Sequence, residues 1–131
     1  MSFLSAFNAH FKEFMEDIMI IFPNDKTIKT TYNTVNLLIK ANPRQAIKTW
    51  NKFITLKYKK EISKGDFSFI TEKDYTEDIM QTQNTDKTYI LEHIEIIREK
   101  VRAMDENNKE KAMKYIQNLC KLGELYINET R

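Results

Sequence analysis

Three kinds of side chain in this 131-residue chain have the chemistry for catalysis or metal binding: two histidines, one cysteine and a cluster of acids. His10 and His93 lie far apart in the sequence, and neither has a Cys, His or carboxylate partner at the spacing of metal ligands. Cys120 lies beside Leu119 on the predicted inner side of a helix, where a small buried thiol is the ordinary interpretation. The sequence therefore predicts no metal site and no nucleophile–base pair.

The acid cluster does not have the spacing of a calcium-binding loop, and it lacks the central glycine that such a loop uses. We interpret it as a set of solvated loop acids or as partners for lysines elsewhere in the chain. Two glycines, Gly65 and Gly123, are too far apart to form a loop that cradles phosphate. We therefore expect no cofactor, no small-molecule substrate and no enzyme activity. The acids concerned are Glu72, Asp74, Glu77 and Asp78.

Charge is distributed unevenly along the chain, although the formal net charge is only +2. Residues 26–64 contain ten basic residues and one acid, whereas residues 65–86 contain six acids and one lysine. In a single helix over 43–64, basic residues four apart, with Lys59 two turns further on, form a stripe beside the apolar face. The candidate surface comprises Arg44, Lys48, Lys52, Lys59, Lys60 and Lys64.

Two interpretations of this basic stripe stay open. It is either a docking surface for phosphates or an acidic partner, or a solvated helix face that the acids of residues 65–86 neutralise. The stripe lacks interleaved exposed aromatics, glycine-rich loops and a DNA-reading signature. Nucleic-acid binding is therefore an alternative to a protein partner.

The elements that carry these residues are predicted to be helices. Only two glycines and two prolines punctuate a chain that is 41% hydrophobic and 31% charged, which disfavours an all-β fold. Asp25 and Asn42 are predicted N-caps, with Pro43 at the first position of its helix, and Gly65 is a predicted C-terminal stop. Apolar residues recur at helical spacing over 2–22, 25–41, 43–64, 86–104 and 107–128.

The predicted architecture is one all-α domain over residues 1–131, a compact bundle of about five helices. A long irregular connection is expected near residues 65–85, with one short helical turn near 78–81. The first helix carries a phenylalanine stripe that belongs mostly to the core. Its terminal apolar residues are a candidate docking turn for a neighbouring subunit: Phe3, Leu4 and Phe7.

Four stretches contain packing and turn signatures that span most of the chain in order: 11–25 (FKEFMEDIMIIFPND), 41–51 (ANPRQAIKTWN), 65–75 (GDFSFITEKDY) and 115–122 (YIQNLCKL). Together they resemble a family of small all-helical proteins of large nucleocytoplasmic DNA viruses whose function is undefined. The resemblance implies a viral setting and transfers no catalytic residue.

A lone cysteine, no signal-peptide core and no transmembrane span lead us to expect a location in the host cytoplasm, the nucleus or the virion, without secretion or membrane association. The first functional hypothesis is a noncatalytic interaction module, a virion component or assembly factor, that binds a protein partner or itself. Opposite charges on 26–64 and 65–86 would then pair between copies or within one chain. The alternative is a nucleic-acid-binding accessory protein that uses the basic face of residues 44–64.

Overall fold

The protein is described by a computed structural model over residues 2–66 and 85–129, with side chains from residue 92 onward in the second range. These residues form helices and the turns between them, which confirms the predicted all-α bundle. The expected helical turn near 78–81 and most of the predicted connection lie outside the described residues. The helical elements are α1 (Phe3–Ile21), α2 (Lys26–Ala41), α3 (Gln45–Trp50), the π-helical segment η1 (Asn51–Thr55), α4 (Leu56–Ser63), α7 (Thr85–Arg102) and α8 (Glu106–Glu129).

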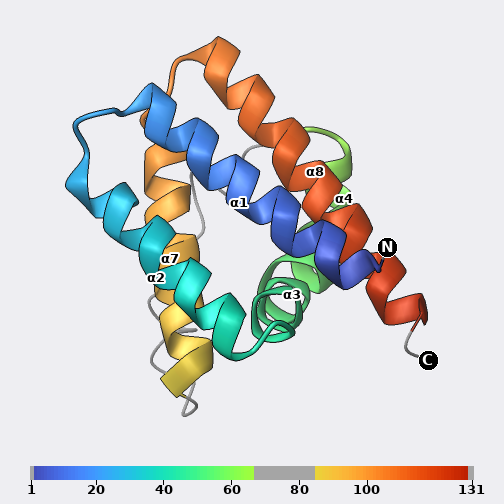
Figure 1. Ribbon diagram of the computed structural model, residues 1–131. Coiled ribbons are helices and arrows are strands. Elements are labelled where there is room, and N and C mark those ends of the chain that lie inside the picture. Colours follow the sequence, from blue (N-terminus) through green and yellow to red (C-terminus); the bar gives the residue numbers. More distant parts are fainter. Residues whose placement is uncertain (1, 67–84, 130–131) are drawn as a thin grey trace.

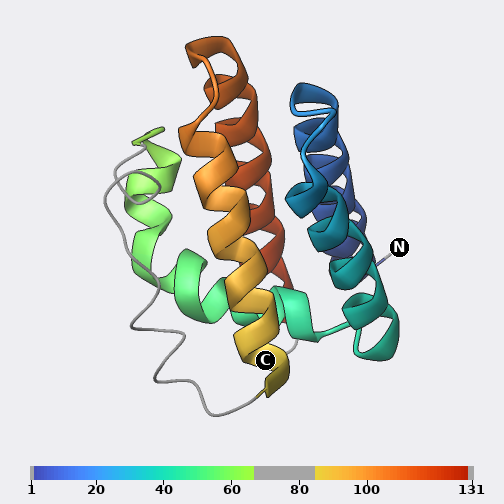
Figure 2. The same ribbon diagram turned by 90° about the vertical axis from the view of Figure 1, so that its left-hand side faces the viewer.

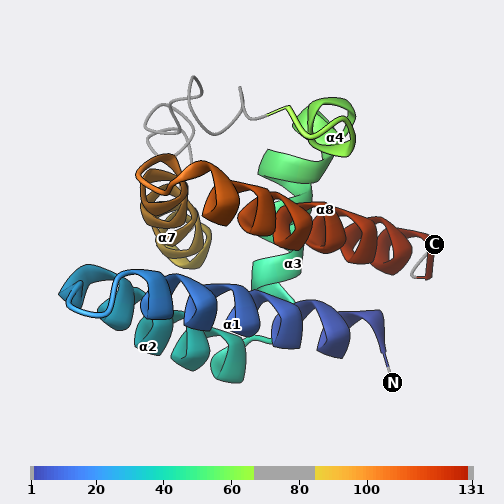
Figure 3. The same ribbon diagram turned by 90° about the horizontal axis from the view of Figure 1, so that it is seen from above.

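The helices stack in layers. α1 and α2 form an antiparallel hairpin that makes one outer layer (Figure 1). α7 and α8 form a second hairpin behind it, and α4 lies on the far side of α8 (Figure 3). α3 and η1 run crosswise along one end of the bundle, from the first layer to α4 (Figure 2). This crossing segment carries the first half of the predicted basic stripe.

α2 and α8 begin where a side chain satisfies free backbone N–H groups. The Asp25 carboxylate accepts hydrogen bonds from the backbone N–H groups of Thr27 and Ile28 at 2.9 and 3.2 Å, which confirms it as the N-cap of α2. Asp105 accepts in the same way from the Asn108 N–H, at 2.8 Å, at the start of α8. The helix bounds predicted for 2–22, 25–41 and 107–128 agree with the structure to within one residue.

Aromatic residues join the outer hairpin to the crossing segment. Phe7, Phe11 and Phe14 of α1 are all buried. The Trp50 ring of α3 packs edge-on against Phe7 and Phe11, with ring centroids 6.3 and 6.0 Å apart. Phe14 stacks on Tyr115 of α8, with centroids 5.1 Å apart. The core therefore extends from α1 to both α3 and α8.

The single helix predicted over 43–64 is wrong in two respects. Pro43 and Arg44 form a turn, and the regular helix begins only at Gln45. The Asn42 side-chain oxygen accepts from the Arg44 N–H at 3.3 Å, as expected of an N-cap, although the regular α-helix begins three residues after Asn42. The second departure is η1, in which the Leu56 N–H donates to the Asn51 carbonyl five residues back.

The π turn changes the direction of the chain. A π turn holds more residues than an α turn, so it rotates the following side chains about the helix axis, and such bulges often coincide with kinks. α4 leaves η1 at a steep angle to α3 and runs along α8 (Figures 2 and 3). Residues before and after η1 therefore do not share one helix face.

Gly65 ends α4 as predicted. Its backbone has φ +74°, in the left-handed region that favours glycine. The Asp66 N–H donates to the Glu61 carbonyl at 2.8 Å and the Gly65 N–H to the Ile62 carbonyl at 3.0 Å, the paired bonds of a Schellman motif.

Candidate functional site

The predicted basic stripe is divided by the π turn. Arg44, Lys48 and Lys52 are exposed on the crossing segment, before or within η1. Lys59 lies on α4 and faces α8, where its ammonium is 3.5 Å from the Glu124 carboxylate. Lys60 and Lys64 are exposed on α4, in a different layer of the bundle. The six residues therefore do not form one surface.

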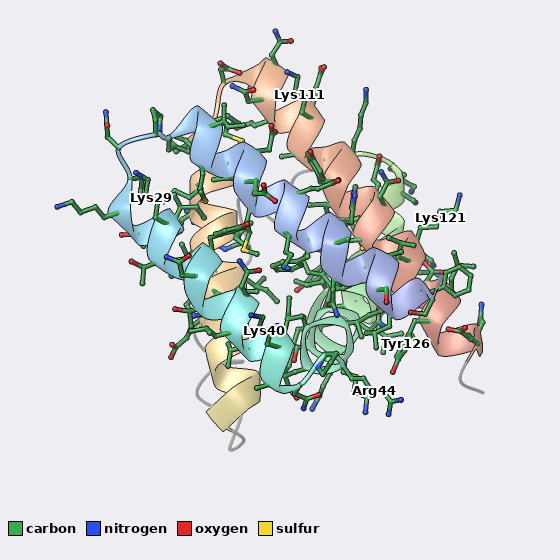
Figure 4. All side chains as sticks on the ribbon, in the orientation of Figure 1. Lys29, Lys40, Arg44, Lys111, Lys121 and Tyr126 are labelled. Carbon is green, nitrogen blue, oxygen red and sulfur yellow. The ribbon has the colours of Figure 1, made fainter. Side chains whose placement is uncertain are left out.

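Lys40 is a further exposed cation near this segment. It lies in the last turn of α2, four residues before Arg44, and Figure 4 shows the two residues on either side of the turn from α2 into the crossing segment. Sequence reasoning missed this residue because it belongs to another helix. The charge excess of residues 26–64 was the only signal that pointed to it. We define the cationic corner as Lys40, Arg44, Lys48 and Lys52.

The cationic corner carries no compensating acid within the described part of the chain. No carboxylate of residues 2–66 or 85–129 forms an ion pair with any of its four residues. The Lys52 ammonium lies 5.3 Å from the centre of the Phe53 ring, a cation–π contact that orients it. By contrast, Lys100 of α7 donates to the Asp25 carboxylate, and Arg98 pairs with Glu95. The surface is thus a local excess of positive charge.

The predicted docking turn at the start of α1 is only partly available. Phe7 is 0% exposed and belongs to the core, so the prediction is wrong for this residue. Phe3 and Leu4 are half-buried, and Leu4 packs against the core of its own chain. An apolar stripe on an amphipathic helix faces inward where other elements cover it, and here Trp50 covers Phe7.

A buried polar contact joins the π-helical segment η1 to α8. The Asn51 amide donates to the Gly123 carbonyl of α8 at 3.1 Å, and both residues are buried. A Cβ atom on Gly123 would lie 2.1 Å from the Asn51 side-chain oxygen, so only glycine allows this approach. The neighbouring Cys120 is buried as predicted. Burial raises the pKa of its thiol. This group joins α8 to η1.

The two histidines lie in separate places. His93 Nδ1 is 3.3 Å from the Thr31 hydroxyl oxygen, which links α7 to α2, and burial lowers the pKa of His93. His10 lies on α1, 3.7 Å from the Glu13 carboxylate, and burial lowers its pKa more than Glu13 raises it. Neither histidine is paired with Cys120 among the described residues.

His10 also borders an open groove of about 350 Å³ between α1 and α8. Acids of α1 lie on one side of this groove and lysines of α8 on the other, without an ion pair between them in the described part of the chain. A second groove of about 330 Å³ lies between α4 and α8, and Cys120 borders it. The first groove is lined by His10, Glu13, Asp17, Lys111, Lys114 and Tyr115.

Within residues 2–66 and 85–129, no three His, Cys, Asp or Glu side chains gather as metal ligands do. No helix in these ranges is long and apolar enough to cross a membrane. No protein-family model, curated protein or solved structure matches the chain. The cationic corner and the two grooves are therefore the features from which a function has to be argued.

Proposed function

We propose that the chain is a noncatalytic interaction module, a small helical bundle that joins a larger viral assembly as a virion component or assembly factor. The viral setting comes from the family that stretches 11–25, 41–51, 65–75 and 115–122 resemble. The proposed binding surface is the cationic corner, and its partner is an acidic protein surface.

The observation that carries this proposal is the unpaired positive charge of the corner. Arg44, Lys48 and Lys52 recur at every fourth position, Lys40 ends the helix just before them, and all four are exposed with no described carboxylate paired to them. Like charges held close together repel, and an anionic partner removes that repulsion while it gains charge-assisted hydrogen bonds. Arg44 suits this role because its guanidinium binds carboxylates in a two-pronged geometry.

A second candidate, nucleic-acid binding, draws on the same cations. Phosphates satisfy lysine and arginine as carboxylates do, and their binding weakens steeply with salt. Of the face proposed from the sequence, residues 44–64, only Arg44, Lys48 and Lys52 remain in the cationic corner, because α4 bends away and Lys59 pairs with Glu124; Lys40 of α2 is added to them.

Titration of the purified chain against a poly-glutamate peptide, duplex DNA and single-stranded DNA across a salt series tests both candidates. The first candidate predicts binding to poly-glutamate at low salt. The variant Arg44→Gln/Lys48→Gln should lose that binding, whereas the matched variant Lys60→Gln/Lys64→Gln on α4 should keep it. Lys52 is left intact because it contacts Phe53.

The DNA titrations separate the candidates. If duplex DNA binds more tightly than the peptide, each lost phosphate contact should lower the log–log salt slope by about 0.9, and the nucleic-acid candidate is preferred. If neither the peptide nor DNA binds at low salt, the cationic corner is a solvated surface and both candidates fail.

A further inference from the structure

The outer faces of α1 and α2 form a second charged surface, which adjoins the cationic corner at the C-terminal end of α2. α1 exposes Glu16 toward its C-terminal end, and α2 exposes Lys26 and Lys29 at its N-terminal end. Neither lysine forms an ion pair with a described carboxylate. We define these three residues, with Ile20 and Leu37, as the hairpin face.

Two large apolar side chains lie exposed within this face. Ile20 of α1 is 76% exposed and Leu37 of α2 is 67% exposed. Leu56 of α4, in another layer, is the third exposed large hydrophobic among the described residues. Apolar side chains flanked by charges of both signs are typical of a protein-binding surface and contribute nothing to phosphate binding.

From these observations we infer that the hairpin face binds the same face of a second copy of the chain, to form a symmetric dimer. The face carries both signs of charge, so it is complementary to itself. The formal net charge of +2 leaves little repulsion between copies.

The antiparallel hairpin determines which symmetry brings opposite charges together. The C-terminal end of α1 and the N-terminal end of α2 lie at the same end of the layer, beside the connecting turn (Figure 1). A two-fold axis parallel to the helices places each α1 on the partner's α2, and brings Glu16 near Lys29 of the partner subunit twice. A two-fold axis perpendicular to the helices, in the plane of the face, places α2 on the partner's α2. Lysines of one copy then face lysines of the other. Electrostatics therefore selects the first arrangement.

The same arrangement gives the exposed leucine a place to pack. Leu37 lies near the level of Ala9 in the hairpin, and Ala9 is exposed on α1. A small residue lets the partner's helix approach closely enough for Leu37 to pack against α1. With 16 residues, α2 is about 24 Å long. At about 10 Å width per helix, two helices bury about 500 Å² per copy, or about 1,000 Å² in total, which suits a weak dimer.

Sedimentation equilibrium at protein concentrations up to about 100 μM and low salt tests this inference. The wild-type chain should reach twice its monomer mass and dissociate as salt is added, because exposed pairs are screened. Glu16→Lys and Lys29→Glu should each raise the dissociation constant about tenfold, since each change creates like-charge contacts on both sides of the axis.

A mixture of the two variants provides the decisive comparison. A dimer of Glu16→Lys with Lys29→Glu contains one unchanged and one exchanged ion pair, so the equimolar mixture should recover the mass that each variant loses alone. The matched variants Glu110→Lys and Lys121→Glu, exposed on α8, should dimerise as the wild type does. A wild-type chain that stays monomeric, a mixture without recovery, or equal losses in the α8 variants overturns the inference.

The inference and the proposed function fail independently. Arg44→Gln/Lys48→Gln removes charge from the cationic corner and leaves the hairpin face unchanged, so it should abolish poly-glutamate binding without altering the dimer mass. Loss of the dimer with peptide binding intact would remove only the inference.

Discussion

The hairpin of α1 and α2 and the segment from α3 to α4 both follow an amphipathic sequence pattern, yet they fold differently. In the hairpin, α-helical hydrogen bonding runs without a break from Phe3 to Ile21 and from Lys26 to Ala41. In the second segment, η1 interrupts the helix at Asn51–Thr55, and the chain turns there. The difference lies in what each segment packs against.

The inner face of α1 is mostly apolar, and its buried polar side chain, Asn8, donates to the Pro43 carbonyl at 2.9 Å from a helix that stays regular. At η1 a polar side chain, Asn51, is buried against the backbone of Gly123. Burying an amide is favourable only when it is hydrogen-bonded, and the π turn accompanies this bond. A surface predicted from helical spacing therefore extends only as far as the regular helix does. Here the basic surface ends at η1.

The largest expected effect concerns the hairpin core. Phe7→Ala should lower the free energy of unfolding by about 4 kcal/mol, because it leaves a cavity against Trp50. Phe3→Ala is the matched control, since Phe3 is only half-buried, and it should cost about 1 kcal/mol. Urea denaturation measures both. Equal small losses would mean that Phe7 is not a core residue.

The next effect tests the contact at η1. Gly123→Ala should cost about 3 kcal/mol, because the new methyl group displaces the Asn51 side chain and breaks its buried hydrogen bond. The double variant Asn51→Ala/Gly123→Ala should be less destabilised than the sum of the two single variants. Strict additivity in this cycle would show that the two residues do not interact.

A smaller effect on the free energy of unfolding depends on pH and concerns His93, which links α7 to α2 of the hairpin. Burial lowers the pKa of His93, so below about pH 6.5 the unfolded chain binds a proton that the folded chain resists. Stability should therefore be constant above that pH and fall as the pH is lowered toward 5. His93→Gln should reduce the slope of unfolding free energy against pH in this range. His10, whose pKa is also lowered, should supply the slope that remains.

The smallest stability effects concern the surface cations on either side of η1. Lys48→Gln and Lys59→Gln should each change the free energy of unfolding by less than about 0.5 kcal/mol, since both side chains are exposed. Their effects on poly-glutamate binding should differ: Lys48→Gln weakens it, and Lys59→Gln leaves it unchanged. Equal weakening of poly-glutamate binding by both changes would mean that the lysines on the two sides of η1 belong to one binding surface.

Much of the fold was predictable because the information is local. Asp25 and Gly65 act as predicted at helix ends, since capping depends on residues a few positions away. The fate of Phe7 was not predictable in the same way, because its burial depends on Trp50, forty-three positions later in the chain.

The candidate surface was predictable only in part, for the same reason. Arg44, Lys48 and Lys52 followed from four-residue spacing within one segment. The contribution of Lys40 depends on how α2 meets the crossing segment, and the pairing of Lys59 depends on where Glu124 of α8 lies. The π turn follows no sequence spacing, because it accompanies a tertiary contact between Asn51 and Gly123.

The proposed binding surface is the cationic corner, which ends at η1. Titration of poly-glutamate at low salt into the wild type, Arg44→Gln/Lys48→Gln and Lys60→Gln/Lys64→Gln tests this proposal. We expect tight binding by the wild type and the α4 variant, and a loss of at least about tenfold in affinity for the Arg44/Lys48 variant. Equal losses in the two variants, which remove the same charge, would contradict it.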